Sequence, residues 1–120
     1  MLEIKETKSV DNYINQIKKY GADESSALVF EAQSGGELLG YGFCVLNGES
    51  IVFKELSAAD KNIYEGLLRA MLNSADLRGI HSAVFEIEDL NKVKSLCELE
   101  KGNILPEIGT FFDKKCCNNS

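Results

Sequence analysis

The chain has 120 residues, 44% hydrophobic and 27% charged, an ordinary composition for one globular domain, residues 1–120, with a core large enough to fold alone. Its formal net charge of −6 argues against nucleic acid or an anionic membrane as the main partner, because such binding rests on clustered cations. No segment has the length and hydrophobicity of a signal peptide or a membrane span, so we expect a cytoplasmic protein.

The first half of the chain predicts a strand, a helix and then three strands in succession. The clearest signal is Asn47-Gly48 between two apolar, β-rich runs, because both residues accept the positive φ of a type I′ hairpin turn. The strands on either side of this turn should therefore be antiparallel neighbours. The predicted segments are Leu2–Glu6 (strand), Val10–Tyr20 (helix), and Ser26–Gln33, Glu37–Leu46 and Glu49–Leu56 (strands).

A long amphipathic helix follows the hairpin. Its start signal is Ser57-Ala-Ala-Asp60, where the hydroxyl and the carboxylate would each accept a bond from an unpaired amide, so the helix should begin at about Ala58. Gly79 ends it, and the β-rich run His81–Ile87 then predicts a strand parallel to the one before the helix. The expected buried face consists of Ile63, Leu67, Leu68, Met71, Leu72 and Ala75.

The last third of the chain carries weaker signals. Asp89–Glu100 has apolar residues at helical spacing behind an aspartate cap, and Gly102 ends this predicted helix. Residues 104–120 contain the single proline and the pair Phe111-Phe112, and they fit either a strand or a short helix that lays Phe111 on the core.

Cysteine and histidine give no metal-site pattern. The four cysteines lack the C-x-x-C spacing of a zinc site and the density of a disulfide scaffold, so we expect free thiols. Cys44, in a strand expected to be central, should be an inert core thiol. Cys116 and Cys117 sit in a polar tail and should be exposed to oxidation. A site that combines the single histidine, His81, with a cysteine is a minor alternative.

Two segments carry a family resemblance: Glu37-Leu-Leu-Gly-Tyr-Gly42 in the third strand and Gly66-Leu-Leu-Arg-Ala70 in the long helix. Together with the order of elements, they resemble the GCN5-related N-acetyltransferase superfamily. The element order matches over Leu2 to Glu100 and the residue pattern over Gly36 to Ile87. The resemblance implies an α/β (α+β) fold, with a mixed central β-sheet and helices on both faces. It also implies that the fourth and fifth strands diverge around acetyl-CoA, and that an acyl group passes from acyl-CoA to an amine.

Members of this superfamily hold the coenzyme A pyrophosphate with a loop of the form Arg/Gln-x-x-Gly-x-Gly/Ala, whose free amides at the helix start bind anions. In this chain Ala59, Asn62 and Tyr64 stand at the arginine and glycine positions. Asp60 adds a carboxylate where the pyrophosphate would sit, and as a helix cap it would compete with that anion. The residues that the resemblance assigns to the cofactor are Leu56, Asp60, Lys61, Asn62 and Ile63.

Glu55 and Tyr64 are the candidate catalytic residues. Alternation along the strand places Glu55 on one face with Ile51 and Phe53, where a carboxylate with a raised pKa would act as a general base toward an amine. Tyr64 would donate its hydroxyl to a thioester or to the leaving thiolate. The structural interpretations are a capped or solvated carboxylate for Glu55 and helix packing for Tyr64.

We expect a small-molecule cleft beside Glu55, Gly40 and Tyr64. Glycines on one face of a strand permit the close approach of a ligand, or equally of another backbone under a helix. A mostly apolar cleft with one carboxylate would suit an amine better than a phosphate compound. The alternative is that Tyr64 and Phe53 fill this space and leave a closed core.

Three functional hypotheses remain open, so the sequence does not decide whether the chain is an enzyme. The first is an N-acetyltransferase-like domain that transfers an acyl group from acyl-CoA to an amine. The second is a non-catalytic domain of the same fold that binds a small ligand or a protein. The third is an interaction protein that forms a homodimer through its sheet edge or through Phe111-Phe112.

Overall fold

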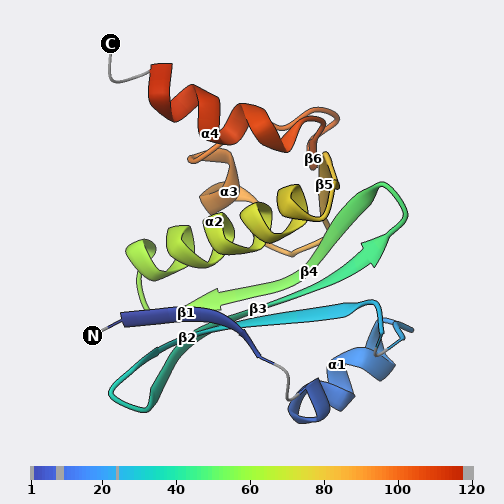
Figure 1. The fold of residues 1–120 in the computed structure, drawn as a ribbon, viewed down its shortest axis with the longest axis vertical. Helices are drawn as coiled ribbons and strands as arrows, with labels where there is room; N and C mark the ends of the chain where they lie inside the picture. The colour runs from blue at the N-terminus through green and yellow to red at the C-terminus, as the bar shows by residue number, and fades with distance from the viewer. Residues whose placement is uncertain (1, 8–9, 24, 118–120) are drawn as a thin grey trace.

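The computed structural model describes residues 2–7, 10–23 and 25–117, with side chains for these apart from positions 10 and 113–117. The described residues contain one six-stranded sheet in the order β1-β2-β3-β4-β5-β6 (Figure 1). All neighbouring strands are antiparallel except β4 and β5, which are parallel, so the expected mixed sheet is confirmed. The strands are β1 (Leu2–Thr7), β2 (Ala27–Ser34), β3 (Glu37–Asn47), β4 (Ser50–Ala58), β5 (Ser82–Phe85) and β6 (Ile104–Leu105).

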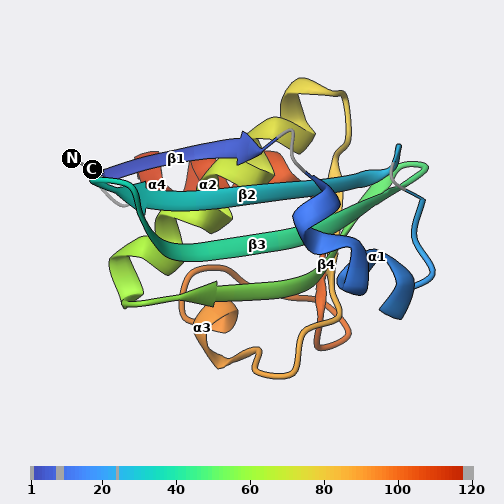
Figure 2. The same ribbon diagram turned by 90° about the horizontal axis from the view of Figure 1, so that it is seen from below.

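Helices lie on both faces of the sheet, as expected. Figures 1 and 2 show α2 across one face and α1 on the opposite face. The buried side chains accordingly form two clusters, a large one between the sheet and α2, α3 and α4, and a small one that includes Tyr13 and Ile17. The helical segments are the 3-10 turn η1 (Val10–Tyr13), α1 (Ile14–Lys19), α2 (Lys61–Leu77), α3 (Asn91–Lys94) and α4 (Ile108–Cys117).

The hairpin between β3 and β4 forms as predicted, but its turn lies one residue further along. Asn47 pairs with Ser50, so Gly48 and Glu49 are the two loop residues. Of these two only Gly48 has a positive φ, of 62°, which is the pattern of a type II′ turn rather than type I′. Asn47 thus belongs to the strand and pairs with Ser50, and Gly48 alone supplies the positive φ that the turn requires.

Helix α2 begins three residues later than the capping pattern predicted. Ser57 and Ala58 remain in β4, where Ala58 pairs with Gly40, and Asp60 is the N-cap, with its Oδ1 accepting a bond from Ile63 N–H at 2.9 Å. Strand pairing therefore overrides the capping role predicted for Ser57. The predicted buried face is confirmed, and Gly79 closes the helix with φ of 81°.

Strands β4 and β5 are parallel neighbours only over their first four residues. Ser50–Phe53 pairs with Ser82–Phe85, and the last bond between the two segments runs from Glu86 N–H to the Phe53 carbonyl at 2.9 Å. Beyond this point β4 continues to Ala58 while the chain after β5 turns away. The two segments are therefore neighbours that diverge, as the superfamily resemblance implied.

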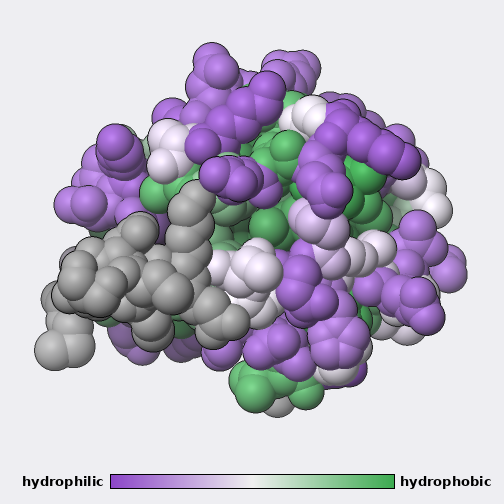
Figure 3. Space-filling model, turned by 90° about the horizontal axis from the view of Figure 1, so that it is seen from above, coloured by the Kyte–Doolittle hydropathy of each residue, from purple (hydrophilic) through white to green (hydrophobic). Residues whose placement is uncertain are grey.

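The C-terminal third differs most from the sequence-based expectation. Only Asn91–Lys94 is α-helical within the helix predicted over 89–100. The following segment contains both alternatives, the short strand β6 and the helix α4, and Phe111 is buried in the core. Figure 3 looks down on the α4 end, where hydrophobic surface shows between hydrophilic side chains. Among the described residues no helix is long and apolar enough to cross a membrane.

Candidate functional site

A cleft of about 500 Å³ opens where β4 and the chain after β5 separate. Its walls come from four parts of the chain that the fold brings to this point. They are Lys19 and Tyr20 at the end of α1, Tyr41 in β3, Lys54–Ser57 in β4 and Glu86–Glu88 after β5.

Glu55 lies in this cleft between two tyrosines. The Tyr20 hydroxyl donates a hydrogen bond to Glu55 Oε2 and the Tyr41 hydroxyl donates one to Glu55 Oε1, each at 2.6 Å. Bonds of this length from a hydroxyl to a carboxylate are charge-assisted and stronger than neutral ones. The three side chains therefore hold each other in place across α1, β3 and β4.

These contacts determine the protonation states in the cleft. Burial by itself raises the pKa of Glu55, but the hydrogen bonds from Tyr20 and Tyr41 and the charge of Lys19 outweigh burial and lower that pKa below its ordinary value. Burial, followed by the bond to the carboxylate, raises the pKa of each tyrosine to about 12. At neutral pH Glu55 is thus an anion and both phenols are neutral. The raised pKa expected for Glu55 is wrong.

A β-bulge explains this difference. Phe43 of β3 pairs with Glu55, and the next residue, Cys44, pairs with Phe53, so Lys54 is an extra residue in β4. The bulge breaks the alternation of the strand and turns Glu55 to the face covered by α1, while Phe53 belongs to the cluster under α2. Glu55 therefore does not end the apolar row of Ile51 and Phe53, as the sequence pattern predicted.

Replacing Glu55 by glutamine should remove a pH-dependent part of the folding stability. Because the folded-state pKa of Glu55 lies below the ordinary value of 4.5, the ionised carboxylate stabilises the fold above that pH, and this stabilisation is lost as the pH falls through the folded-state pKa. Between about pH 5 and about pH 3 the free energy of unfolding should fall more steeply for the native chain than for Glu55→Gln. Urea unfolding of both proteins at several pH values in this range tests this prediction. The same dependence of the free energy of unfolding on pH in both proteins would contradict it.

The two lysines of the cleft flank the Tyr20 ring. Lys19 Nζ lies 5.2 Å and Lys54 Nζ 5.6 Å from the ring centroid, within the range of cation–π contacts. Lys54 also forms an ion pair with Glu86. With Glu55 and Glu88, the cleft has three carboxylates and two ammonium groups among its lining residues, a net charge of −1.

Leu56 contributes backbone groups to the cleft. The bond from Ala59 N–H to the Leu39 carbonyl (2.8 Å) fixes which residue pairs of β3 and β4 exchange hydrogen bonds. Because bonded and non-bonded pairs alternate, Gly42 and Leu56 form a non-hydrogen-bonded pair. The N–H and C=O of Leu56 therefore point away from β3, toward the side from which β5 has departed.

The other residues assigned to the cofactor lie beyond the cleft at the start of α2. Only Ala59 and Asp60 separate β4 from α2, and Asp60 binds the Ile63 amide as the helix cap. Lys61 and Asn62 are exposed, and Ile63 is buried in the core. The described cleft is lined by Leu56 but not by these residues.

Tyr64 and the two glycines face the core under α2 and not the cleft. Tyr64 is 4% exposed, and its hydroxyl has no hydrogen-bond partner among the described residues. Burial raises its pKa to about 12. A Cβ at Gly40 would lie 2.7 Å from the Ser57 carbonyl oxygen, and one at Gly42 would lie 2.4 Å from Met71 Sδ. The structure therefore separates Tyr64 from Glu55, and the glycines serve close packing.

The remaining candidate residues lie outside the cleft. Cys44 is fully buried and donates a weak Sγ–H bond to the Leu28 carbonyl at 3.7 Å, and burial holds its pKa far above the usual range, so the inert core thiol is confirmed. The exposed His81 has Nδ1 3.9 Å from Glu107 Oε1. The side chains of Cys116 and Cys117 lie outside the described part of the chain.

The tyrosines and lysines of the cleft were not predicted as site residues. Alternation along β3 places Tyr41 and Cys44 on opposite faces of the sheet. Knowledge of the bulge would then have placed Glu55 on the same face as Tyr41. Tyr20 appeared only as the end of a helix, since the sequence does not show which strand that end meets. The sequence thus shows the tyrosines themselves but not that the fold brings them to Glu55.

Comparison with known proteins places the fold. No protein-family profile matches the chain, and no curated protein matches it in sequence. Among solved structures, the ribosomal-protein-S18-alanine N-acetyltransferase from Escherichia coli has a TM-score of 0.63 at 14% identity, over 80% of this chain and 76% of that one. The IAA acetyltransferase from Bacillus cereus has a TM-score of 0.57 at 17% identity, over 71% and 65%. The PaiA N-acetyltransferase from Thermoplasma acidophilum, in complex with coenzyme A, has a TM-score of 0.54 at 14% identity, over 80% and 68%.

These similarities establish the class of fold. The chain has the mixed α+β fold of the GCN5-related N-acetyltransferases, with the diverging β4 and β5. It spans just under two thirds of the Bacillus cereus chain.

Proposed function

We propose that this N-acetyltransferase-type domain binds a small amine in the cleft beside Glu55 and does not hold coenzyme A by its phosphates. The observation that carries the proposal is the Glu55 carboxylate, which two neutral phenols keep ionised at the point where β4 and β5 diverge. An amine is the ligand that such a group recognises, through a charge-assisted hydrogen bond.

The carboxylate has room for this ligand. A carboxylate offers about four lone-pair positions; the tyrosines use one on each oxygen and the Gln16 side chain also bonds to the group, which still leaves an acceptor for an ammonium group. The net negative charge of the cleft and of the whole chain favours a cation over an anion. Because its pKa is lowered, Glu55 would attract and orient an ammonium group rather than remove a proton from it.

The start of α2 supports the second half of the proposal. An anion at this helix end would compete with the Asp60 carboxylate, which already accepts a bond from the Ile63 amide. A two-residue link between β4 and α2 leaves no loop to surround a pyrophosphate. Tyr64, at the position of a loop glycine, fills space in the core under α2.

Acyl transfer from a thioester is the second candidate function. It is favoured by the Leu56 N–H, which points into the gap between the strands and could donate a hydrogen bond to the thioester carbonyl oxygen. The bound ammonium group would first lose a proton to solvent. The neutral nitrogen would then attack the carbonyl carbon, the C–S bond would break, and the thiolate would take up the second proton that the nitrogen loses. The acyl donor would then be held by its pantetheine part, since the start of α2 would not bind its phosphates.

Titration with n-butylamine, followed in the ¹H–¹⁵N spectrum, tests the amine site. We expect shifts centred on Glu55, Tyr20 and Tyr41, and no comparable shifts with n-butanol or butyrate, which match the chain length without the positive charge. Glu55→Gln should weaken binding by at least about tenfold, since losing a charged hydrogen bond costs about 1.5–3 kcal/mol. Equal binding of butanol, or no effect of Glu55→Gln, would contradict the proposal.

Calorimetry with acetyl-CoA and S-acetylpantetheine separates the two functions. If the phosphates contribute nothing, the two thioesters bind with similar affinity. Much tighter binding of acetyl-CoA than of S-acetylpantetheine would contradict the proposal that Asp60 excludes phosphates from the start of α2. Leu56→Pro removes the N–H from the gap without breaking a bond to β3, whereas Leu56→Ala keeps it. Loss of thioester binding and of thiol release in Leu56→Pro alone would support acyl transfer. No thioester binding at all would leave the amine site as the function.

A further inference from the structure

Strand β1 is an open edge of the sheet. It pairs with β2 on one side, and no described strand lies on its other side (Figure 2). An edge strand presents unpaired backbone N–H and C=O groups, which can pair with a strand of another chain. The opposite edge, β6, has only two residues, so β1 is the longer open edge of the described sheet.

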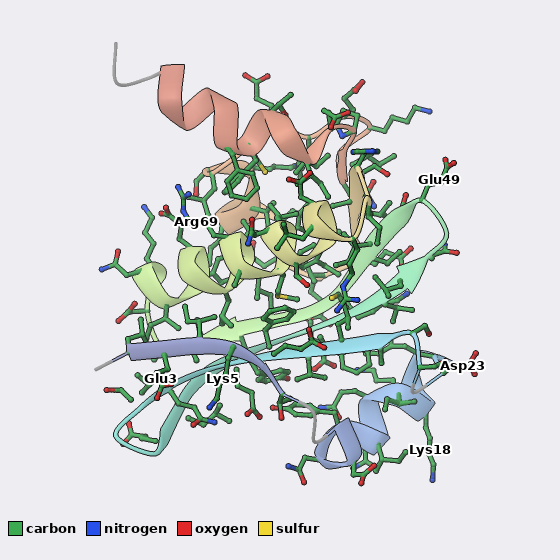
Figure 4. The ribbon with its side chains drawn as sticks, in the orientation of Figure 1. Glu3, Lys5, Lys18, Asp23, Glu49 and Arg69 are labelled. Carbon is green, nitrogen blue, oxygen red and sulfur yellow. The ribbon has the colours of Figure 1, made fainter. Side chains whose placement is uncertain are left out.

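Strand β1 carries two exposed side chains of opposite charge. Glu3 and Lys5 are exposed, and both project from β1 on the face away from α2 (Figure 4). Within the described residues no ion pair involves either of them. Ile4, between them, faces the other way and packs its Cδ1 against Gly66 of α2, which keeps the strand on the sheet.

We infer that β1 pairs antiparallel with β1 of a second copy, about a twofold axis at Ile4. In this register Glu3 faces Lys5 of the second copy and Lys5 faces its Glu3, so the interface gains two facing pairs of opposite charge. A twofold axis at Glu3 or at Lys5 would place like charges opposite each other, which is unfavourable. Of the registers with the twofold axis at Glu3, Ile4 or Lys5, only the one at Ile4 therefore places opposite charges face to face.

The resulting dimer has one continuous sheet through both copies. Its interface consists of the backbone bonds of β1, the two charge pairs on the face away from α2, and Leu2 facing Glu6 of the other copy on the α2 face. Leu2 is one of four exposed large hydrophobic side chains among the described residues. A single strand pair buries less area than a standard interface, so the dimer should dissociate on dilution and weaken as salt is raised.

Charge exchange tests this register with the full chain. We expect sedimentation velocity to show a monomer–dimer equilibrium for the native protein. Glu3→Lys and Lys5→Glu should each raise the dissociation constant by at least about tenfold, because each single change opposes like charges twice. The double exchange Glu3→Lys with Lys5→Glu should restore the native dissociation constant, since it recreates both pairs with reversed sign.

Circular dichroism of each variant serves as the folding control, since both side chains are exposed. Amide hydrogen exchange gives a second measurement: exchange at β1 in the native protein should slow as concentration rises. A native chain that stays monomeric up to millimolar concentration overturns the inference. A dimer that is insensitive to both single exchanges, or one that the double exchange fails to restore, overturns this interface.

Discussion

Replacing Tyr64 by alanine is expected to lower the free energy of unfolding by about 3–5 kcal/mol, the range for truncating a large aromatic side chain in a core. Tyr64 is 4% exposed and belongs to the cluster between α2 and the sheet. Alanine would leave a cavity that the other side chains of this cluster cannot fill without moving. The change should not alter the amine cleft, because Tyr64 does not line it.

Replacing the same residue by phenylalanine should have the opposite effect. The Tyr64 hydroxyl is buried without a hydrogen-bond partner in the described structure, and an unsatisfied buried polar group costs about 1–3 kcal/mol. Tyr64→Phe should therefore stabilise the fold by about 1 kcal/mol or more. Urea unfolding of the two variants measures both effects. A destabilised Tyr64→Phe protein would show that the hydroxyl has a partner in solution, and that its role is more than packing.

Replacing Gly40 by alanine is expected to lower the free energy of unfolding by about 2–3 kcal/mol, at the upper end of the range for overpacking. The added Cβ would lie 2.7 Å from the Ser57 carbonyl oxygen and 3.0 Å from the Ala58 Cα. Both are backbone atoms of the paired strand β4, so they cannot move aside as a flexible side chain can. The Leu67 side chain, at 3.1 Å, closes the remaining direction. Relief would require β3 and β4 to separate.

Gly109→Ala is the matched control. In α4 the added Cβ would meet only Glu107 Oε1, at 3.6 Å, and the residue has no positive φ. Alanine should therefore be neutral or stabilise by up to about 1 kcal/mol, because it reduces the entropy lost by a glycine in a helix. Chemical denaturation of both variants distinguishes the packing effect from the general effect of glycine. Equal stability of the Gly40→Ala and native proteins would mean that Gly40 is not needed for close packing.

Local patterns predicted most of the fold because they reflect local physics. Period-2 alternation predicted the strand β1 and the helical stripe predicted the helix α2, and the structure has both, although α2 begins three residues later than expected. Errors arose where pairing with another strand decided the outcome. Ser57 had the residue type and spacing of a cap, but pairing of β4 with β3 extended the strand past it.

The candidate site was less predictable for the same reason. Glu55 was found from its residue type, but its neighbours come from α1 and β3, and only the folded chain brings Tyr20 and Tyr41 to it. Its lowered pKa follows from those neighbours and not from the sequence around it. Tyr64 was assigned by its position relative to a family loop. In the structure α2 follows β4 after only two residues, and Tyr64 lies in its first turn with its side chain in the core.

The bulge at Lys54 also bears on how this strand should be compared with its relatives. A chain of the same length that paired β3 with β4 without the bulge would carry the same glutamate on the opposite face of the sheet, among the apolar residues under α2, whereas a chain that lacked Lys54 would keep it on the α1 face. An alignment of β4 without a gap would then equate two carboxylates that lie on different sides of the molecule. Gain or loss of this bulge at constant chain length is therefore enough to create or abolish an acidic site in this strand, with no change in any side chain.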